Sequence, residues 1–224
     1  MQITVIGLGG VGSILVERLS RFLNYTAEQD ADMLFVDGDA YELKNYERQE
    51  FSQMGNKAEI KMNDLALKFP NIKYDFYPAY INEANVVDVI KNDSIVFLCV
   101  DNHKSRKIIN NYCRHLDNIT LISGGNELTD GNVQLYVRRE GKDLTPHISA
   151  YHPEIENPDD KLPEEMSCEE LANSEPQLYF TNLGVATLMC WSFYNAIMKE
   201  QYTASEVYFD ITQMTSVAHA RAIK

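Results

Sequence analysis

The chain has 224 residues, of which 45% are hydrophobic, and it is therefore long enough to bury the core of one domain. Lys and Arg total 20 against 33 Asp and Glu, which gives a formal net charge of −13. This balance argues against binding to nucleic acid or to an anionic membrane surface. No apolar run is long enough to span a bilayer, and a strand is expected directly after Met1. We therefore expect neither a leader peptide nor a membrane anchor.

The first stretch of the chain carries the clearest pattern. Residues 2–6 form an apolar, partly β-branched run that predicts a buried strand, and residues 11–23 have helical periodicity. The turn between them contains Gly7, Gly9, Gly10 and Gly12. A glycine turn that opens a helix presents bare N–H groups to a phosphate, so we expect a nucleotide here. The alternative is that the glycines serve only strand–helix packing.

Strands and helices then alternate along the chain. Further strands are expected at residues 33–37, 74–78, 94–100 and 120–123, and helices at residues 55–69, 83–90 and 105–116. This order predicts an α/β fold with a Rossmann-like, doubly wound and mostly parallel sheet. Ligands of such sheets bind at the carboxyl ends of the strands.

The pattern changes after residue 130. Residues 132–137 alternate as an antiparallel strand does, and two further strands are expected at residues 206–210 and 216–220. The apolar helix expected at residues 182–200 should cover the sheet, with a dimer interface as the alternative. We expect a single domain over residues 1–224, with a long crossover loop at about 140–176.

That loop is rich in charged and polar side chains. It contains an acidic run, Asp159, Asp160, Glu164 and Glu165, and the histidines His147 and His152. The simplest interpretation is a solvated loop with surface histidines. A basic partner is the alternative for the acidic residues.

The four cysteines form no C-x-x-C pair, so the sequence predicts neither a disulfide framework nor a zinc site. Cys99, Cys113 and Cys190 lie in apolar segments and are expected in the core. Cys168 lies in the polar loop. We expect a reduced, cytoplasmic protein.

Charged side chains follow several of the expected strands. Asp37 ends the second strand at about the distance from the glycine turn, roughly 20 residues, that suits a ribose-binding carboxylate. Arg48 and Lys57 supply cations for phosphate, and Asp101 supplies a carboxylate for a hydrated Mg²⁺. This combination favours cleavage of a nucleoside triphosphate over hydride transfer.

Six blocks of sequence together resemble the ThiF/MoeB/ubiquitin-activating enzyme family. They are Gly7-Leu-Gly-Gly-Val-Gly12, Asp37-Gly-Asp39, Asn45-Tyr-Glu-Arg48-Gln49, Gly55-Asn-Lys57-Ala58, Asp101-Asn102 with Arg106 and Asn110, and Gly124-Gly125. Their order and spacing on alternating strands and helices make the resemblance specific. It runs from residue 2 to about residue 137 and resumes at residue 182.

The resemblance implies an adenylyltransferase that uses ATP and Mg²⁺ on the C-terminal carboxylate of a ubiquitin-like, β-grasp protein ending in Gly or Gly-Gly. Carried over by position, Asp37 would hold the ribose and Asp101 would hold Mg²⁺. The triphosphate and its developing charge would be bound by Asn45, Arg48 and Lys57, with Gln49 in support. Asp39 and Asn102 belong to the same nucleotide-binding blocks. The resemblance also favours a homodimer.

Cys168 is a candidate acceptor for the activated acyl group, because some members of this family carry such a cysteine in this region. The alternative is an incidental thiol, since the surrounding acids would raise its pKa. Two family features are missing: the paired C-x-x-C motifs, and an N-terminal helix whose arginine reaches the ATP of the partner protomer.

Two other classes of function remain open. A nicotinamide-dependent oxidoreductase would need a catalytic Tyr, Lys or His pair that we do not find. A non-catalytic nucleotide-binding scaffold is disfavoured by the intact set of Arg48, Lys57 and Asp101. Within the main interpretation, the substrate is alternatively a small-molecule or peptide carboxylate, or a carbamoylated tRNA adenosine, which the acidity of the chain makes the least favoured.

Overall fold

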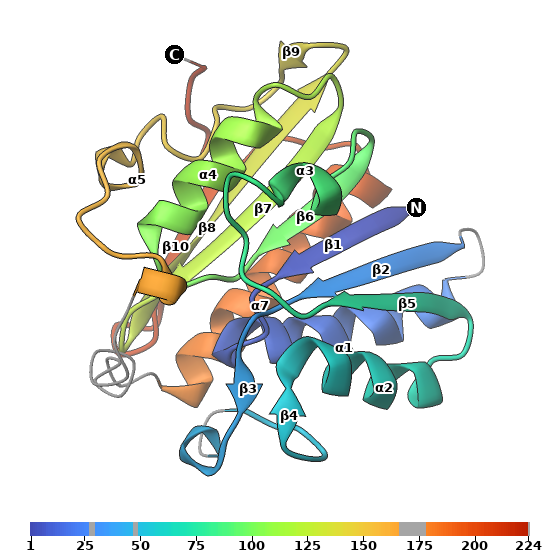
Figure 1. Ribbon diagram of the computed structural model, residues 1–224. Coiled ribbons are helices and arrows are strands. Elements are labelled where there is room, and N and C mark those ends of the chain that lie inside the picture. The colour runs from blue at the N-terminus through green and yellow to red at the C-terminus, as the bar shows by residue number, and fades with distance from the viewer. Residues whose placement is uncertain (27–29, 47–48, 166–177, 224) are drawn as a thin grey trace.

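The computed structural model describes residues 1–26, 30–46, 49–165 and 178–223. Its centre is a nine-stranded sheet in the order β11-β10-β8-β7-β6-β1-β2-β5, with β9 paired to β8 (Figure 1). The parallel strands are β1 (Gln2–Ile6), β2 (Ala31–Val36), β5 (Ile72–Tyr77), β6 (Ser94–Leu98) and β7 (Ile119–Asn126). The antiparallel strands are β8 (Asp130–Arg139), β9 (Lys142–Asp143), β10 (Glu206–Asp210) and β11 (Thr215–His219). The predicted doubly wound sheet is confirmed.

Helices cover both faces of this sheet, which explains why its central strands β1 and β6 are almost entirely buried. One face carries α1 (Gly10–Tyr25), α2 (Lys57–Lys68) and α7 (Tyr179–Phe193). The other carries α3 (Val86–Val89), α4 (His103–Cys113) and α5 (Pro153–Glu156). The strand β6 lies between the two layers, and all five of its residues are buried.

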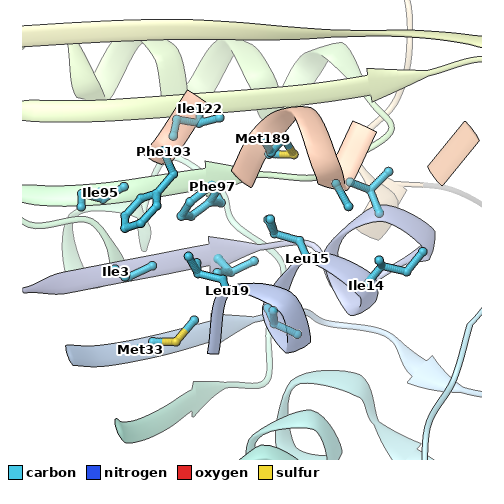
Figure 2. Close-up of a cluster of buried hydrophobic side chains, with 14 of the residues drawn as sticks. Ile3, Ile14, Leu15, Leu19, Met33, Ile95, Phe97, Ile122, Met189 and Phe193 are labelled. Carbon is cyan, nitrogen blue, oxygen red and sulfur yellow. The ribbon is translucent and has the colours of Figure 1, made fainter. Parts of the chain in front are cut away.

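The larger core lies between α1, α7 and the sheet, and Figure 2 shows part of it. The rings of Phe97 in β6 and Phe193 in α7 have centroids 5.9 Å apart. Leu15 and Leu19 of α1 are fully buried beside them. Each such side chain stabilises the fold by roughly 1.5–3 kcal/mol relative to exposure. This packing fixes α1, and therefore the glycine turn that precedes it, against the sheet.

The strand order reverses at β1, and folds of this kind have a ligand-binding crevice outside the carboxyl ends of the strands at such a point. The strand β1 has β2 on one side and β6 on the other, and the chain reaches β6 only after passing through β5. Such a reversal of strand order separates the loops that leave the neighbouring strands, which is where ligands of these folds bind. The loops after β1, β2 and β6 meet at this position.

The secondary structure of two segments differs from the sequence prediction. Residues 38–54 were expected to be only polar connection, but they contribute η1 (Leu43–Asn45) and the strand β3 (Ala40–Tyr41), which pairs with β4 (Gly55–Asn56). The last long helix begins at Tyr179 and passes at Tyr194 into the π-helical turn η3 (Tyr194–Met198). That helix covers the sheet as expected, with Val185 and Met189 buried, while Phe180 and Trp191 are 67% and 61% exposed.

The acidic part of the crossover segment is anchored, which corrects the prediction of a solvated loop. Asp160 accepts hydrogen bonds from the backbone N–H of His103 and, at 3.1 Å, from that of Lys104. Its carboxylate therefore caps the N-terminus of α4, where negative charge is stabilised. Lys104 also pairs with Glu165 in η2 (Pro163–Glu165), at 2.6 Å.

His152 is likewise more buried than expected of a surface histidine, with 14% of its side chain exposed. It bonds to Glu154 and Glu206, and Glu206 also accepts from Arg221 at 2.7 Å. Burial raises the pKa of Glu206, but its hydrogen bonds outweigh burial and hold the pKa at about 2. This cluster ties the start of α5 to β10.

Among the helices that the structure describes, none has the length and apolar character needed to cross a membrane.

Candidate functional site

The glycine turn after β1 is shaped by close contacts. Gly7 has a φ of +87°, and a Cβ there would lie 2.8 Å from the carbonyl oxygen of Cys99. A Cβ on Gly12 would lie 1.9 Å from the carbonyl oxygen of Gly7. Both positions therefore require glycine for packing alone. Gly10 is the first residue of α1 and is buried.

Gly9 differs from its neighbours because packing does not explain it. The nearest atom to a Cβ there would be the Nε2 of Gln49, 3.9 Å away. Gly9 is the N-cap of α1, and no side chain caps this helix. The first N–H groups of α1 thus face a bare Cα and open space, the arrangement in which helices bind phosphate.

Asp37 follows β2 and braces the glycine turn. One carboxylate oxygen accepts from the N–H of Leu8 at 2.6 Å, and the other accepts from the N–H of Asp39 at 2.8 Å. The side chain is 7% exposed, and burial raises the pKa of Asp37 to about 6 despite the opposing charge of Lys57. Each oxygen keeps a second lone pair, so a ribose hydroxyl can still donate to this carboxylate.

Lys57 begins α2 and points toward the loop after β2. Its ammonium lies 3.1 Å from Oδ2 of Asp39, and only 6% of its side chain is exposed. Asn56, whose side chain caps α2, also donates to the carbonyl oxygens of Asp37 and Asp39, at 2.8 and 3.3 Å. Asn56 therefore holds the backbone of the loop that carries both aspartates. The sequence motif contained this residue but suggested no role for it.

Asn45 and Gln49 lie next to each other and are both 5% exposed. Asn45 accepts from the N–H of Glu42 at 3.1 Å, and its carbonyl oxygen accepts from the N–H of Gln49 at 3.0 Å. Among the described residues, Oε1 of Gln49 has no hydrogen-bond partner. Because buried amide groups are normally paired, this unpaired group next to Gly9 marks a position for a ligand or water.

Asp101 and Asn102 follow β6 and have different environments. Asp101 is exposed, and within the described part of the chain its carboxylate makes no hydrogen bond or ion pair. Asn102 is buried and accepts from the N–H of Ser105 at 2.8 Å, so its side chain starts α4. Asp101 is thus the carboxylate that remains available at this strand end.

Arg106 connects the ends of β6 and β7. Its guanidinium donates to Ser123 Oγ at 2.5 Å and to the carbonyl oxygens of Val100 and Gly124 at 2.6 and 2.7 Å. The side chain is buried, and burial lowers its pKa. Arg106 therefore fixes the loop that carries Asp101. The sequence placed it in a motif without giving it this structural role.

Two predicted residues, Arg48 and Cys168, lie outside the described residues. The three described cysteines pack in or against the core. Burial raises the pKa of Cys99 and Cys113 to about 12 and that of Cys190 to about 11. These three thiols are therefore poor nucleophiles. No group of three or more His, Cys, Asp or Glu in the described ranges could hold a metal ion.

A separate groove of about 240 Å³ lies between α7, η3 and the β10–β11 hairpin, and Trp191, Val207 and Ala218 are among its lining residues. None of the residues of the six sequence blocks lines it. The candidate site is therefore the crevice at the strand ends rather than this groove.

Comparison with known proteins agrees with the geometry. The model of the ThiF family matches residues 1–223. The chain belongs to the ThiF family. This confirms the resemblance drawn from the six sequence blocks.

The curated relatives within this family are considerably longer than the region they share. Ubiquitin-like modifier-activating enzyme 5 of Gallus gallus is 29% identical over 154 residues, which cover 62% of this chain and 37% of the relative. Molybdopterin-synthase adenylyltransferase of Haemophilus influenzae is 25% identical over 139 residues, covering 60% of this chain and 54% of the relative. The chain thus spans between about a third and a half of these two proteins.

Solved structures show the same fold for this ThiF chain. E. coli MccB with ATP has a TM-score of 0.74 at 17% identity, covering 99% of this chain and 64% of MccB. E. coli MccB with succinimide has a TM-score of 0.75 at 18% identity, with the same coverage. At this identity the likeness establishes the Rossmann-like architecture alone.

Proposed function

We propose that this ThiF-family chain is an adenylyltransferase that binds ATP in the crevice after β1, β2 and β6. The observation that carries the proposal is Gly9, a helix N-cap where a Cβ would meet no atom closer than 3.9 Å, beside Gln49, whose buried Oε1 has no partner among the described residues. The relative named as an adenylyltransferase and the MccB structure with ATP support the same chemistry.

Each residue near this crevice has a role that its surroundings suit. The N–H groups at the start of α1 would bind phosphate oxygens, and Asp37 would accept from a ribose hydroxyl. Lys57 would bind the triphosphate, and Asn45 and Gln49 would contribute polar groups beside it. Arg48 belongs to this set by sequence position only, because it lies outside the described residues.

Asp101 would hold Mg²⁺ together with phosphate oxygens and water. A triphosphate would enter a site that already contains three carboxylates, those of Asp37, Asp39 and Asp101. Among the described residues, Lys57 is the cation that pairs with one of them, Asp39. The excess negative charge favours a bound divalent cation, which would offset phosphate charge. Asp101 is suited to this because it is exposed and keeps its carboxylate oxygens free of protein partners in the described chain.

The reaction that this arrangement supports is attack by a carboxylate on ATP. A carboxylate oxygen of the substrate forms a bond to the α-phosphorus, and the bond from that phosphorus to the bridging oxygen of the β-phosphate breaks. Pyrophosphate carries away the released electron pair, and an acyl-adenylate remains. The protein contributes position and electrostatic stabilisation, and no covalent intermediate with the enzyme is needed at this step.

We further propose that the substrate is a β-grasp protein with a C-terminal Gly or Gly-Gly, and that the enzyme works as a cytoplasmic homodimer. Relatives named as ubiquitin-like modifier-activating and molybdopterin-synthase enzymes support the first part. The structures of MccB with MccA make a peptide carboxylate the second candidate. Transfer of the acyl group to Cys168 stays a prediction from sequence.

The test uses labelled ATP and candidate carrier proteins that end in Gly-Gly. With label in the α-phosphate, we expect transfer to the carrier and release of AMP. With label in the γ-phosphate, we expect pyrophosphate. A carrier shortened by its last two residues is the matched control and should receive no label. Release of ADP and inorganic phosphate instead would show a different reaction.

A further inference from the structure

Tyr80 lies in the candidate site, although it belongs to none of the six sequence blocks. It follows β5 by three residues, and its ring packs against Gly38 in the loop after β2. A Cβ on Gly38 would lie 2.6 Å from Cδ2 of this ring, so the contact requires glycine at position 38. The hydroxyl of Tyr80 donates to Oδ1 of Asp39.

Asp39 therefore has two partners, one on each carboxylate oxygen. Oδ1 accepts from Tyr80 and Oδ2 accepts from the ammonium of Lys57 at 3.1 Å. The three side chains come from the loop after β5, the loop after β2 and the start of α2. They form a chain of contacts that ends at the cation proposed to bind the triphosphate.

This chain of contacts matters because Lys57 already pairs with a carboxylate. To bind a phosphate, the ammonium must move away from Asp39 or share its charge. Asp39 would then face the like charge of the neighbouring buried Asp37 without its cation, and the two carboxylates would repel each other. The hydroxyl of Tyr80 is the partner that stays with Asp39 when Lys57 leaves.

We propose that Tyr80 is a positioning residue for ATP binding. Its hydroxyl holds Asp39 in place, so that the ammonium of Lys57 can leave Asp39 and bind the triphosphate. This inference rests on the proposed function. It adds a residue that acts through Asp39 and Lys57 rather than through contact with the reacting atoms.

The surroundings of Tyr80 keep it a donor. Burial, the hydrogen bond to Asp39 and the nearby charges of Asp37 and Asp101 all raise the pKa of the Tyr80 hydroxyl. The phenol therefore stays protonated at neutral pH. A phenylalanine would keep the ring on Gly38 and remove only this donor.

The experiment is calorimetric titration of ATP with Mg²⁺ into the wild type, Tyr80→Phe, Asp39→Ala and the double variant, with unfolding temperatures measured in parallel. Tyr77→Phe, at the end of β5, is the matched control. We expect Tyr80→Phe to weaken ATP binding by roughly 10- to 100-fold, the range of one hydrogen bond to a charged group. In the Asp39→Ala background the same change should have almost no further effect.

The outcomes separate the two proposals. If the wild type binds ATP and Tyr80→Phe binds it equally well, the proposed role of Tyr80 is wrong. It is also wrong if Tyr80→Phe weakens ATP binding as much in the Asp39→Ala background as in the wild type. A loss that matches a fall in unfolding temperature and also appears in Tyr77→Phe shows general damage and overturns it too. If the wild type binds no ATP, the proposed function itself fails.

Discussion

The ammonium of Lys57 lies 3.1 Å from a carboxylate oxygen of Asp39, and the lysine side chain is almost completely enclosed. The cation that we propose to bind phosphate is thus paired with a carboxylate of the same chain. Because this pair is already formed, a strong anion such as a triphosphate would have to compete with Asp39 for the ammonium.

Replacement of Lys57 by Met should weaken ATP binding by more than about 100-fold, because a charge-assisted contact to phosphate is lost. Stability should change by less than about 1 kcal/mol, since Asp39 is 45% exposed and keeps its bond to Tyr80. Calorimetry and thermal unfolding measure the two effects. Lys68→Met is the control, because Lys68 is an exposed lysine on the same helix, and it should leave ATP binding unchanged.

Gly9 and Gly12 should respond differently to alanine. Gly9→Ala should change the free energy of unfolding by about 1 kcal/mol or less, because its Cβ meets nothing within 3.9 Å, yet it should weaken ATP binding at least about tenfold. Gly12→Ala should cost more than about 3 kcal/mol, because its Cβ would overlap the carbonyl of Gly7. Urea unfolding and ATP titration distinguish these cases. Full ATP affinity in Gly9→Ala would contradict a phosphate site at this turn.

Asp37 should titrate near pH 6, because burial raises its pKa from an ordinary value of 3.8. Between about pH 4 and 6, Asp37 is therefore protonated in the folded state and ionised in the unfolded state. Stability from this group is therefore present at low pH and decreases as the pH rises through that window, by about 3 kcal/mol. The carboxyl ¹³C resonance of Asp37, assigned by its loss in Asp37→Asn, reports the midpoint. A midpoint at 4 or below would contradict the buried environment.

Arg106 should be needed for the fold of the site. Arg106→Met leaves the carbonyl oxygens of Val100 and Gly124 without their donor, and we expect a loss of about 3–5 kcal/mol in unfolding free energy. Arg114→Met, a change at an exposed arginine just after the same helix, is the control and should cost less than about 1 kcal/mol. Similar losses for both variants would show that the guanidinium contacts near Asp101 contribute little.

The sequence predicts the parallel half of this fold well because its central strands are apolar runs. Strand β6 and helix α1 have clear periodicity, and the handedness of βαβ connections then leaves few arrangements. The two-residue strands β3 and β4 are too short to show a period, and they pair only with each other, with Ala40 opposite Asn56 and Tyr41 opposite Gly55. Short pairs of this kind depend on tertiary contacts.

The sequence predicted the candidate-site residues that belong to motifs. It missed those whose role depends on contacts between segments that lie far apart along the chain. The glycine turn, Asp37 and Lys57 follow from spacing along the chain. The bond from Tyr80 to Asp39 depends on β5 lying beside β2, and the cap that Asp160 places on α4 joins residues 57 positions apart. No local sequence pattern predicts such contacts. The exposure of Trp191 is of the same kind, because an apolar helix does not reveal how far the sheet beneath it extends.

Titration of the purified protein with ATP and Mg²⁺, and separately with NAD⁺, tests the central claim most directly. The series should include Lys57→Met and Asp101→Ala. An adenylation site predicts that the wild type binds ATP, that both variants bind it more weakly, and that omission of Mg²⁺ reduces affinity in the wild type more than in Asp101→Ala. Tight binding of NAD⁺ that is indifferent to magnesium and to both substitutions would contradict the account and favour an oxidoreductase.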